Sequence, residues 1–236
     1  CNPPGDYVHP LAESFEDFAG LMNHRAAEIG MKNTHFVTPS GLDDDMHYST
    51  AYDMALLMAE AMKNQSFISL TSSKEKTVSF VYPADRVVTY QNHNRLLSLY
   101  SHCTGGKTGF TKASGRCLVT SAEKNGVRLI AVTLNAPDDW NDHISLYEYG
   151  FSLYSKVILD DTDKCFTLKV AGGNESTLKA SPCESVGVNI PSSKAGNIKT
   201  DIYLPNLLFA PVNKGDEVGR VTYKLNGVEI MSVSIK

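Results

Sequence analysis

The residues with the clearest potential for chemistry lie in one glycine-rich stretch near the middle of the chain. Residues 105–111 read Gly-Gly-Lys-Thr-Gly-Phe-Thr. We predict a strand edge here, because glycine leaves the backbone open to a ligand on the side that lacks a side chain. Lys107 and Thr108 would place an ammonium and a hydroxyl beside that edge, and both groups bind carboxylates. Lys-Thr-Gly alone is a weak signal, and a glycine-rich turn with an ordinary surface lysine explains it better.

Composition indicates a globular protein and argues against two other classes. The chain has 236 residues, of which 42% are hydrophobic and 20% charged, enough for one large domain or two smaller ones. The net charge of −4 and the lack of a Lys/Arg cluster argue against a nucleic-acid binder. No run of about 18 apolar residues is present, so no membrane-spanning helix is predicted.

The cysteines and the first residue say little about compartment. Five cysteines, an odd number, occur without any Cys-x-x-Cys, so neither a zinc site nor a disulfide framework is indicated. The sequence begins at Cys1 without a signal peptide, and we expect this position to be a processing or expression boundary.

The elements around Lys107 are expected to form an antiparallel meander. Strand-forming residues occupy 105–111, 116–124 and 127–134, and Asn125-Gly126 between the last two suits a type I′ turn. The Lys107 strand comes first. A helix that could pack on one face of this sheet is predicted from five apolar residues at helical spacing: Trp140, Ile144, Tyr147, Phe151 and Tyr154.

Two further helices are predicted upstream of the sheet. Ser14 and Asp17 resemble a capping box, and helical periodicity follows as far as Gly30. A second helix starts at Thr50, with Asp53 at the capping-box position. Residues 1–13 are interpreted as an irregular lead-in.

Three other segments can be interpreted: a hairpin, an acidic loop and a β-rich C-terminal region. Residues 77–82 and 87–90 flank Pro-Ala-Asp and predict a hairpin. The acidic run at 43–45, followed by His47, could be a metal site, but a solvated turn is favoured because adjacent carboxylates point in different directions. After about residue 157 short strands alternate with turns, and Asn226-Gly227 marks a second hairpin.

Several stretches in combination resemble a known enzyme family, the serine D-alanyl-D-alanine carboxypeptidases, or low-molecular-mass penicillin-binding proteins (peptidase family S11). The tail around 210–215, Ala-Pro-Val-Asn-Lys-Gly, is similar to the β-rich C-terminal domain of this family. The other stretches that carry the resemblance are 21–36 (LMNHRAAEIGMKNTHF), 39–43 (PSGLD), 47–53 (HYSTAYD), 92–97 (NHNRLL), 106–111 (GKTGFT) and 115–121 (GRCLVTS).

The resemblance implies an activity and a set of site residues. These enzymes remove the terminal D-alanine from peptidoglycan stem peptides through a serine acyl-enzyme, and β-lactams acylate the same serine. They work outside the cytoplasm and need no metal or organic cofactor. By resemblance, Lys107 and Thr108 hold the substrate carboxylate, Gly109 lets the substrate approach, and the backbone N–H of Phe110 donates to the oxyanion.

The same resemblance exposes what this sequence lacks. In the family, a Ser-x-x-Lys nucleophile motif and a Ser-x-Asn motif both precede the helix predicted here to begin at Ser14. No Ser-x-Asn occurs in the 236 residues. Ser-x-x-Lys occurs about as often as chance allows, and we assign none of the three as nucleophile: Ser73/Lys76, Ser121/Lys124 and Ser176/Lys179.

We therefore predict the C-terminal portion of a carboxypeptidase. The fold class is α+β: residues 1–157 form a partial carboxypeptidase domain of antiparallel sheet and helices, and residues 158–236 form a small all-β, sandwich-like domain. We expect the chain alone to be inactive and marginally stable, because without an N-terminal segment it would expose an apolar face and a strand edge.

Two other functions are left open at this point. One is a non-catalytic module that binds peptidoglycan or a protein partner. The other is a different serine acyltransferase such as a β-lactamase, against which the appended β-domain argues. A membrane-anchoring helix is common in this family after the β-domain, so peripheral membrane association of the full-length protein is also left open.

Overall fold

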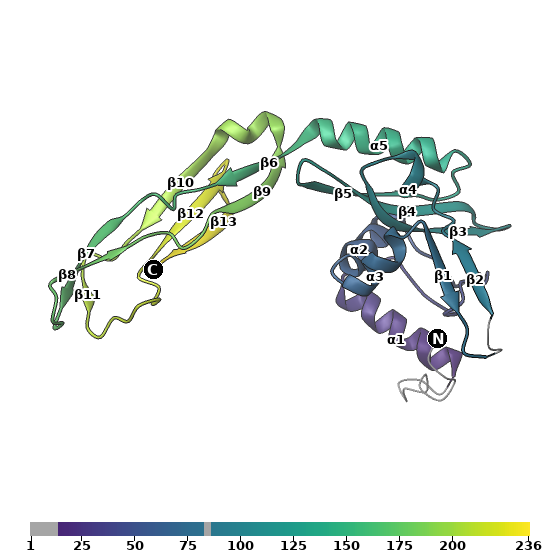
Figure 1. The fold of residues 1–236 in the computed structure, drawn as a ribbon, viewed down its shortest axis with the longest axis horizontal. Coiled ribbons are helices and arrows are strands. Elements are labelled where there is room, and N and C mark those ends of the chain that lie inside the picture. Colours follow the sequence, from purple (N-terminus) through teal and green to yellow (C-terminus); the bar gives the residue numbers. More distant parts are fainter. Residues whose placement is uncertain (1–13, 83–85) are drawn as a thin grey trace. The chain divides into compact units, whose positions relative to one another are not determined.

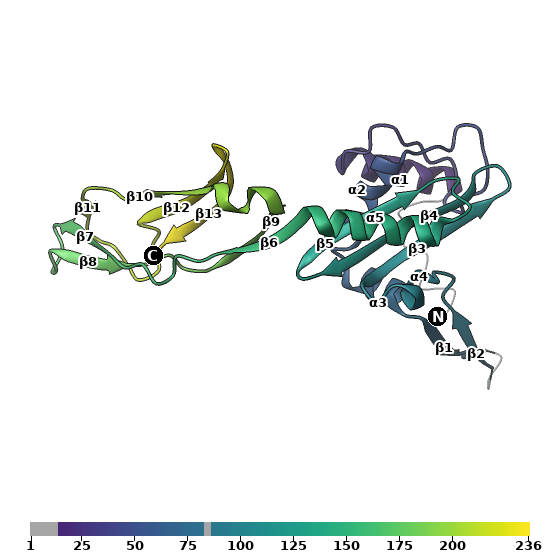
Figure 2. The same cartoon turned by 90° about the horizontal axis from the view of Figure 1, so that it is seen from above.

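A computed structural model describes residues 14–82 and 86–236 (Figures 1 and 2). The predicted α+β class, with antiparallel sheets, helices and a C-terminal β region, is confirmed. The chain forms two compact units: residues up to 124 together with 128–150, and residues 151–236 together with the short turn 125–127. The expected domain boundary after residue 157 stays a prediction, and the lead-in 1–13 lies outside the described residues.

The first unit is built on a three-stranded antiparallel sheet in the order β3-β4-β5. The strands are β3 (Cys103–Thr111), β4 (Gly115–Lys124) and β5 (Val127–Thr133), so the predicted meander is confirmed. Asn125 and Gly126 have φ values of 54° and 75°. Both central residues of a type I′ turn need positive φ, which explains why this dipeptide joins β4 to β5.

Helices lie on both faces of this sheet (Figure 1). The helix α5 (Asp139–Leu153) covers one face, and α2 (Ala51–Ala61) and α3 (Gln65–Ser72) lie against the other. The remaining helices are α1 (Phe15–Glu28) and the short α4 (Leu96–Leu99). Neither α3 nor α4 was predicted, because each has too few turns to show a periodic apolar pattern.

The predicted helix starts are confirmed in position and differ in one detail. Ser14 and Asp17 form the expected capping box at α1. The Thr50 hydroxyl accepts the backbone N–H of Asp53 at the start of α2. The Asp53 carboxylate, however, turns away from the helix and accepts the backbone N–H of Asn33 at 2.7 Å. The prediction that Tyr154 belongs to α5 is wrong, because the chain becomes extended there and begins β6.

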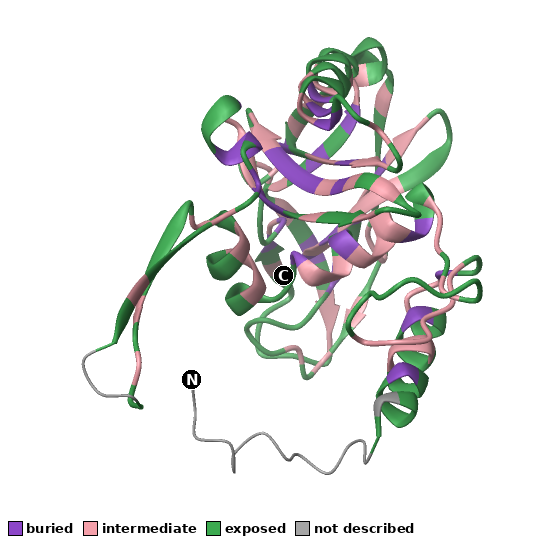
Figure 3. Ribbon diagram, turned by 90° about the vertical axis from the view of Figure 1, so that its right-hand side faces the viewer, coloured by how far each residue is buried: buried purple, intermediate pink, exposed green. Residues whose placement is uncertain are grey.

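A two-stranded hairpin projects from the first unit. It consists of β1 (Glu75–Ser79) and β2 (Val87–Gln91), with Thr77 opposite Thr89. The predicted hairpin is confirmed, but its first strand begins and ends earlier than the predicted range of 77–82. The predicted turn at 83–85 lies outside the described residues. Both strands are largely exposed, as Figure 3 shows for the hairpin with a grey tip.

The second unit is a set of small sheets around its own core. Its central sheet has the order β10-β12-β13, and the turn at Asn226-Gly227 again has positive φ at both residues. The elements are β6 (Tyr154–Leu159), β7 (Phe166–Ala171), β8 (Thr177–Ala180), β9 (Val186–Pro191), η1 (Ser192–Asn197), β10 (Ile198–Tyr203), β11 (Leu208–Phe209), β12 (Gly219–Leu225) and β13 (Val228–Ile235). The buried centre consists of aliphatic side chains and one tyrosine, among them Leu168, Ile190, Val221, Tyr223, Val233 and Ile235.

Candidate functional site

The strand β3 presents backbone groups at an open edge. Among the described residues it is an end strand of its sheet, with β4 on one side only. Phe110 lies opposite Arg116 on β4, and the Arg116 carbonyl accepts from Ala136, on the β5 side, at 2.9 Å. In a β-strand the N–H and C=O of one residue point to the same side, so both groups of Arg116 face β5 and neither bonds to Phe110. Phe110 and Arg116 therefore form a non-hydrogen-bonded pair. The N–H and C=O of Phe110 therefore point away from β4, toward the open edge.

The Lys107 ammonium lies at the same edge. By the alternation of the ladder, the carbonyl of Thr108 faces the same way as that of Phe110. Lys107 Nζ donates to this Thr108 carbonyl at 2.5 Å, which places the charge beside the free edge. The Lys107 side chain is exposed, so a ligand carboxylate could replace or join this contact.

The glycines of the stretch divide into two roles, and one expectation is wrong. Gly105 and Gly106 are buried and do not open the backbone to a ligand. A Cβ on Gly106 would lie 2.4 Å from the carbonyl oxygen of Val119, and one on Gly105 would lie 2.8 Å from the Thr71 hydroxyl. These two glycines allow β3 to pack closely on β4 and α3. Gly109 is the exposed one, and a Cβ there would meet nothing closer than 3.8 Å.

An apolar cavity of about 400 Å³ opens on the α2 face of the sheet, against the Lys107 segment. Its walls combine α2, the start of α3 and all three strands. Nearly all of the lining is aliphatic or aromatic, and the residues include Leu57, Met58, Ala61, Phe67, Val119 and Val132. Such a space next to an exposed strand is unusual in an interior that is otherwise close-packed.

A polar cavity of about 720 Å³ adjoins the same strand. Lys107, Thr108 and Gly109 line both cavities, so the stretch that the sequence singled out separates an apolar space from a polar one. The polar cavity is also lined by Phe110, which brings all four predicted binding residues to one place. Its other lining includes the loop that carries Asp43 to Asp45, together with His47, His93 and the turn between β3 and β4.

Sequence reasoning did not assign this loop to the site. It treated the acidic run as a solvated turn, and the three aspartates are indeed exposed. What the sequence could not show is that the loop folds toward β3. Two buried or half-buried polar groups hold it: Asp53, 1% exposed, accepts from the Asn33 N–H and the Thr34 hydroxyl, and Asn23 pairs with both backbone groups of Phe36.

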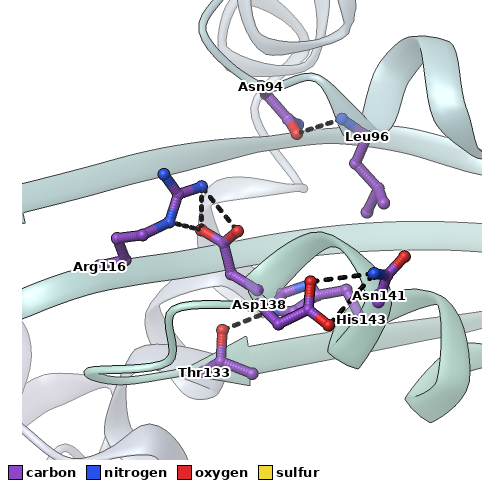
Figure 4. Close-up of polar contacts among 8 residues, drawn as sticks. Asn94, Leu96, Arg116, Thr133, Asp138, Asn141 and His143 are labelled. Carbon is purple, nitrogen blue, oxygen red and sulfur yellow. Dashed lines mark hydrogen bonds and ion pairs between the residues drawn. The ribbon is translucent and has the colours of Figure 1, made fainter.

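The opposite face of the sheet is fastened to α5 by a buried polar network. His143 is fully buried, with its Nδ1 2.7 Å from the Thr120 hydroxyl and its Nε2 3.1 Å from the Thr133 hydroxyl. Burial lowers the pKa of His143 to about 4. Thr120 lies opposite Gly106, so this network reaches the strand that carries Lys107. Figure 4 shows His143 directed at Thr133.

A second anchor on that face is an ion pair at the start of α5. Arg116 on β4 binds the carboxylate of Asp139 through two nitrogens, the shorter contact being 2.7 Å. Asp139 is buried, and the guanidinium also lies over the Trp140 ring at 5.4 Å. This charge-assisted pair fixes the start of α5 against β4.

The three Ser-x-x-Lys sequences lie in three different structural settings. Ser121 is fully buried, its hydroxyl 2.6 Å from that of Thr104, while Lys124 pairs with Glu148. The Ser73 hydroxyl donates to a carbonyl one turn back in α3. The remaining sequence, at 176–179, runs from a turn into β8 of the second unit.

Neither a metal-binding cluster nor a membrane-crossing helix is found in the part of the chain that the structure describes. Residues 14–82 and 86–236 contain no group of three or more His, Cys, Asp or Glu side chains placed to hold a metal ion. Within the same residues, every helix is too short or too polar to cross a membrane.

Comparison with known proteins identifies the family. Residues 8–138 match the family model for D-alanyl-D-alanine carboxypeptidase, peptidase S11, and residues 155–236 match the model for the C-terminal domain of penicillin-binding protein 5. The first match covers more than half of the chain. The chain therefore belongs to the S11 family of serine D-alanyl-D-alanine carboxypeptidases, and the predicted resemblance is confirmed.

Individual relatives support this assignment over the whole chain. The carboxypeptidase DacC of Escherichia coli is 36% identical across 98% of this chain, and DacF of Bacillus subtilis is 31% identical across 95%. Among solved structures, penicillin-binding protein 5 of Haemophilus influenzae aligns with 94% of the chain at a TM-score of 0.62 and 30% identity. This chain spans only 57% of DacC, 58% of DacF and 64% of that solved chain.

Proposed function

We propose that this chain is the carboxylate-binding and C-terminal part of a serine D-alanyl-D-alanine carboxypeptidase that trims peptidoglycan stem peptides and is acylated by β-lactams. The observation that carries the proposal is the open edge of β3. There the Lys107 ammonium and the outward N–H of Phe110 lie on one strand, beside a polar cavity large enough for a peptide end.

Each of the four predicted residues has a role in this proposal. Lys107 and the Thr108 hydroxyl bind the terminal carboxylate of the peptide, which charge-assisted hydrogen bonds favour. Gly109 leaves room for the peptide to lie along the strand, since nothing occupies the space where its side chain would be. The N–H of Phe110, which points to the edge, donates to the oxyanion that forms at the scissile carbonyl.

The nucleophile is proposed to come from an N-terminal segment of the same protein. Two features of the first unit support this: the apolar cavity of about 400 Å³ beside Lys107, and β5, whose outer edge is unpaired among the described residues. A packed helix would fill the cavity and added strands would cover the edge. On this proposal residues 1–157 complete the catalytic domain, residues 158–236 form the appended β-domain, and this chain alone is inactive.

The proposal also fixes where the reaction occurs and what it needs. The substrate is peptidoglycan, so the enzyme acts outside the cytoplasm. The chemistry is acyl transfer through a serine, with proton transfers by side chains and charge stabilisation by the strand, and the proposal assigns no metal or organic cofactor a role.

Labelling with a fluorescent penicillin tests the proposal. The protein extended by its N-terminal segment is expected to form a covalent adduct and to release D-alanine from a peptide that ends in D-Ala-D-Ala. The 236-residue chain alone is expected to form none. An adduct on the chain alone would show that it carries its own nucleophile. An extended protein that is neither labelled nor active would favour a non-catalytic binding module.

Lys107 offers the sharpest single variant for this function. In the extended protein, Lys107→Ala is expected to lower kcat/KM for the peptide by about 10- to 100-fold, because a charged hydrogen bond contributes about 1.5–3 kcal/mol. The matched control is Lys112→Ala. Lys112 follows β3 directly and is also exposed, but it lines neither the apolar nor the polar cavity described above. Equal losses in the two variants would contradict the assigned role.

A further inference from the structure

His47 lies in the wall of the polar cavity, and none of the roles assigned above involves it. It belongs to the loop that faces β3, it is half-buried, and it lines the same cavity as Lys107 and Thr108. The ring is held from two sides. The backbone N–H of Val37 approaches its Nδ1 at 3.2 Å, and the Phe36 ring packs against it edge-on with centroids 5.7 Å apart.

The contact with Val37 determines where the imidazole carries its proton. A backbone N–H only donates, so Nδ1 of His47 must accept and cannot hold a hydrogen. A neutral imidazole has one N–H, which is then on Nε2. No hydrogen-bond partner for this Nε2 is found among residues 14–82 and 86–236. His47 thus offers a donor whose ring orientation is already set before a ligand arrives.

The neighbouring His35 shows the opposite arrangement. Its Nδ1 lies 2.7 Å from the carbonyl of Met46, and a carbonyl only accepts, so here Nδ1 carries the hydrogen. That bond ties one side of the loop to the other, and the backbone bridge between His35 and Tyr48 adds to it. His35 therefore serves the loop itself, whereas His47 uses one nitrogen for the loop and leaves the other for a ligand.

We propose that His47 is a further substrate-binding residue, whose Nε2–H donates a hydrogen bond to a backbone carbonyl of the bound peptide in the cavity that Lys107 lines from β3. This rests on the proposed carboxypeptidase function. The ligand class is an extended peptide with a free terminal carboxylate: Lys107 holds the carboxylate, and His47 holds an acceptor oxygen on the chain. A rigid donor is effective here because little ordering remains to be done on binding.

Two substitutions at His47 separate its two nitrogens. His47→Asn keeps an oxygen near the position of Nδ1, able to accept from Val37, and removes the donor at Nε2. His47→Gln places its amide near the position of Nε2, restores a donor and loses the contact with Val37. The His47→Asn variant is expected to keep its thermal stability. Its kcat/KM for the peptide is expected to fall about three- to tenfold, because it loses one net hydrogen bond to the substrate. The His47→Gln variant is expected to have a higher kcat/KM than His47→Asn but a lower melting temperature.

The experiment uses the protein extended by its N-terminal segment and a peptide ending in D-Ala-D-Ala. His24→Asn serves as the matched control, because His24 is exposed on α1 and lines neither cavity. Nitrogen-15 NMR of labelled histidine, assigned with the His47→Asn variant, is expected to show the hydrogen of His47 on Nε2. A hydrogen on Nδ1 would overturn the inference.

The kinetic outcomes are equally decisive. Full activity of His47→Asn would overturn the inference, as would a loss of activity in both variants that simply follows their melting temperatures. A wild-type extended protein without D-alanine release or penicillin labelling would overturn the proposed function, and the role of His47 with it. An active wild type with an unimpaired His47→Asn variant would overturn the role of His47 alone.

Discussion

The two faces of the β3-β4-β5 sheet differ in how completely they are packed beside β4. On the α5 face, His143 and Tyr147 are buried and both bond to the Thr120 hydroxyl, and Arg116 neutralises the buried Asp139. On the α2 face, an apolar cavity of about 400 Å³ remains between α2 and the strands. Three of the predicted site residues, Lys107, Thr108 and Gly109, line this cavity. We call the α2 face the open face and the α5 face the closed face.

The contacts on the α5 face stabilise the sheet, whereas the cavity on the α2 face is the space proposed for the N-terminal segment. The polar network on the α5 face is satisfied by this chain alone, and it fixes β4 and, through the Thr120–Gly106 pair, β3. On the open face, α2, α3 and the strands surround a cavity that no described residue fills. We therefore expect substitutions on the closed face to change stability, and substitutions on the open face to change how the proposed N-terminal segment docks.

The largest effect is expected at the contact between β3 and β4. Gly106 has φ +155°, and an added Cβ would lie 2.4 Å from the carbonyl oxygen of Val119. Gly106→Ala is expected to lower the free energy of unfolding by about 3 kcal/mol or more, through strained backbone and overpacking. Denaturant unfolding followed by the fluorescence of Trp140, the single tryptophan, measures this in the first unit. Gly109→Ala is the matched control, and comparable losses at both glycines would contradict the packing argument.

A pH titration of stability should reveal the buried histidine of the closed face. The pKa of His143 is lowered to about 4 by burial, despite the nearby Asp139, whereas an unfolded histidine titrates near 6.5. The unfolded state therefore takes up the proton first as the pH falls. The stabilising contribution of neutral His143 is complete above about pH 6.5 and is lost between about pH 6.5 and 4, by about 3 kcal/mol in total. His143→Gln should remove this part of the pH dependence, and an unchanged profile in that variant would refute the assignment.

Adding volume to the closed face should be costly. Ala122 is fully buried on β4, two residues beyond Thr120 and hence on the same face. Ala122→Leu is expected to destabilise the first unit by about 1–3 kcal/mol, because a packed interior has no space for three more carbons. The midpoint of urea unfolding reports the change. A neutral result would mean that the α5 face is less tightly packed than the structure shows.

Adding the same volume to the open face should have the smallest effect. Ala61 lines the apolar cavity, so the side chain of Ala61→Leu has space to enter. The free energy of unfolding of this chain is expected to change by less than about 0.5 kcal/mol. In the extended protein the same leucine should weaken penicillin labelling, because it occupies space proposed for the N-terminal segment. A large destabilisation of the chain alone would remove the contrast between the faces.

Sequence reasoning succeeded where local chemistry determines the structure. Asn125-Gly126 and Asn226-Gly227 could be predicted as turns because few other residues tolerate positive φ at both positions. The capping box at Ser14 could be predicted for a similar reason, since its two bonds join residues three apart. The short helices α3 and α4 could not, because their placement depends on tertiary contacts.

The site was predictable only in part. Lys107 to Phe110 were predicted as binding residues from their motif and its neighbours, and in the structure all four line the polar cavity. The roles of Gly105 and Gly106 were misjudged, because their contacts with Thr71 and Val119 come from residues distant in sequence. The position of His47 in the wall of the polar cavity could not be predicted, because it depends on how Asp53 and Asn23 hold the loop toward β3.

The central claim is that an N-terminal segment supplies the nucleophile. It is tested most directly by supplying that segment as a separate polypeptide. The N-terminal segment and the 236-residue chain are purified apart, mixed, and exposed to fluorescent penicillin. A covalent adduct is predicted on the N-terminal polypeptide only when both are present, and none on the 236-residue chain. An adduct on the 236-residue chain, or full labelling of the N-terminal polypeptide without it, would contradict the account.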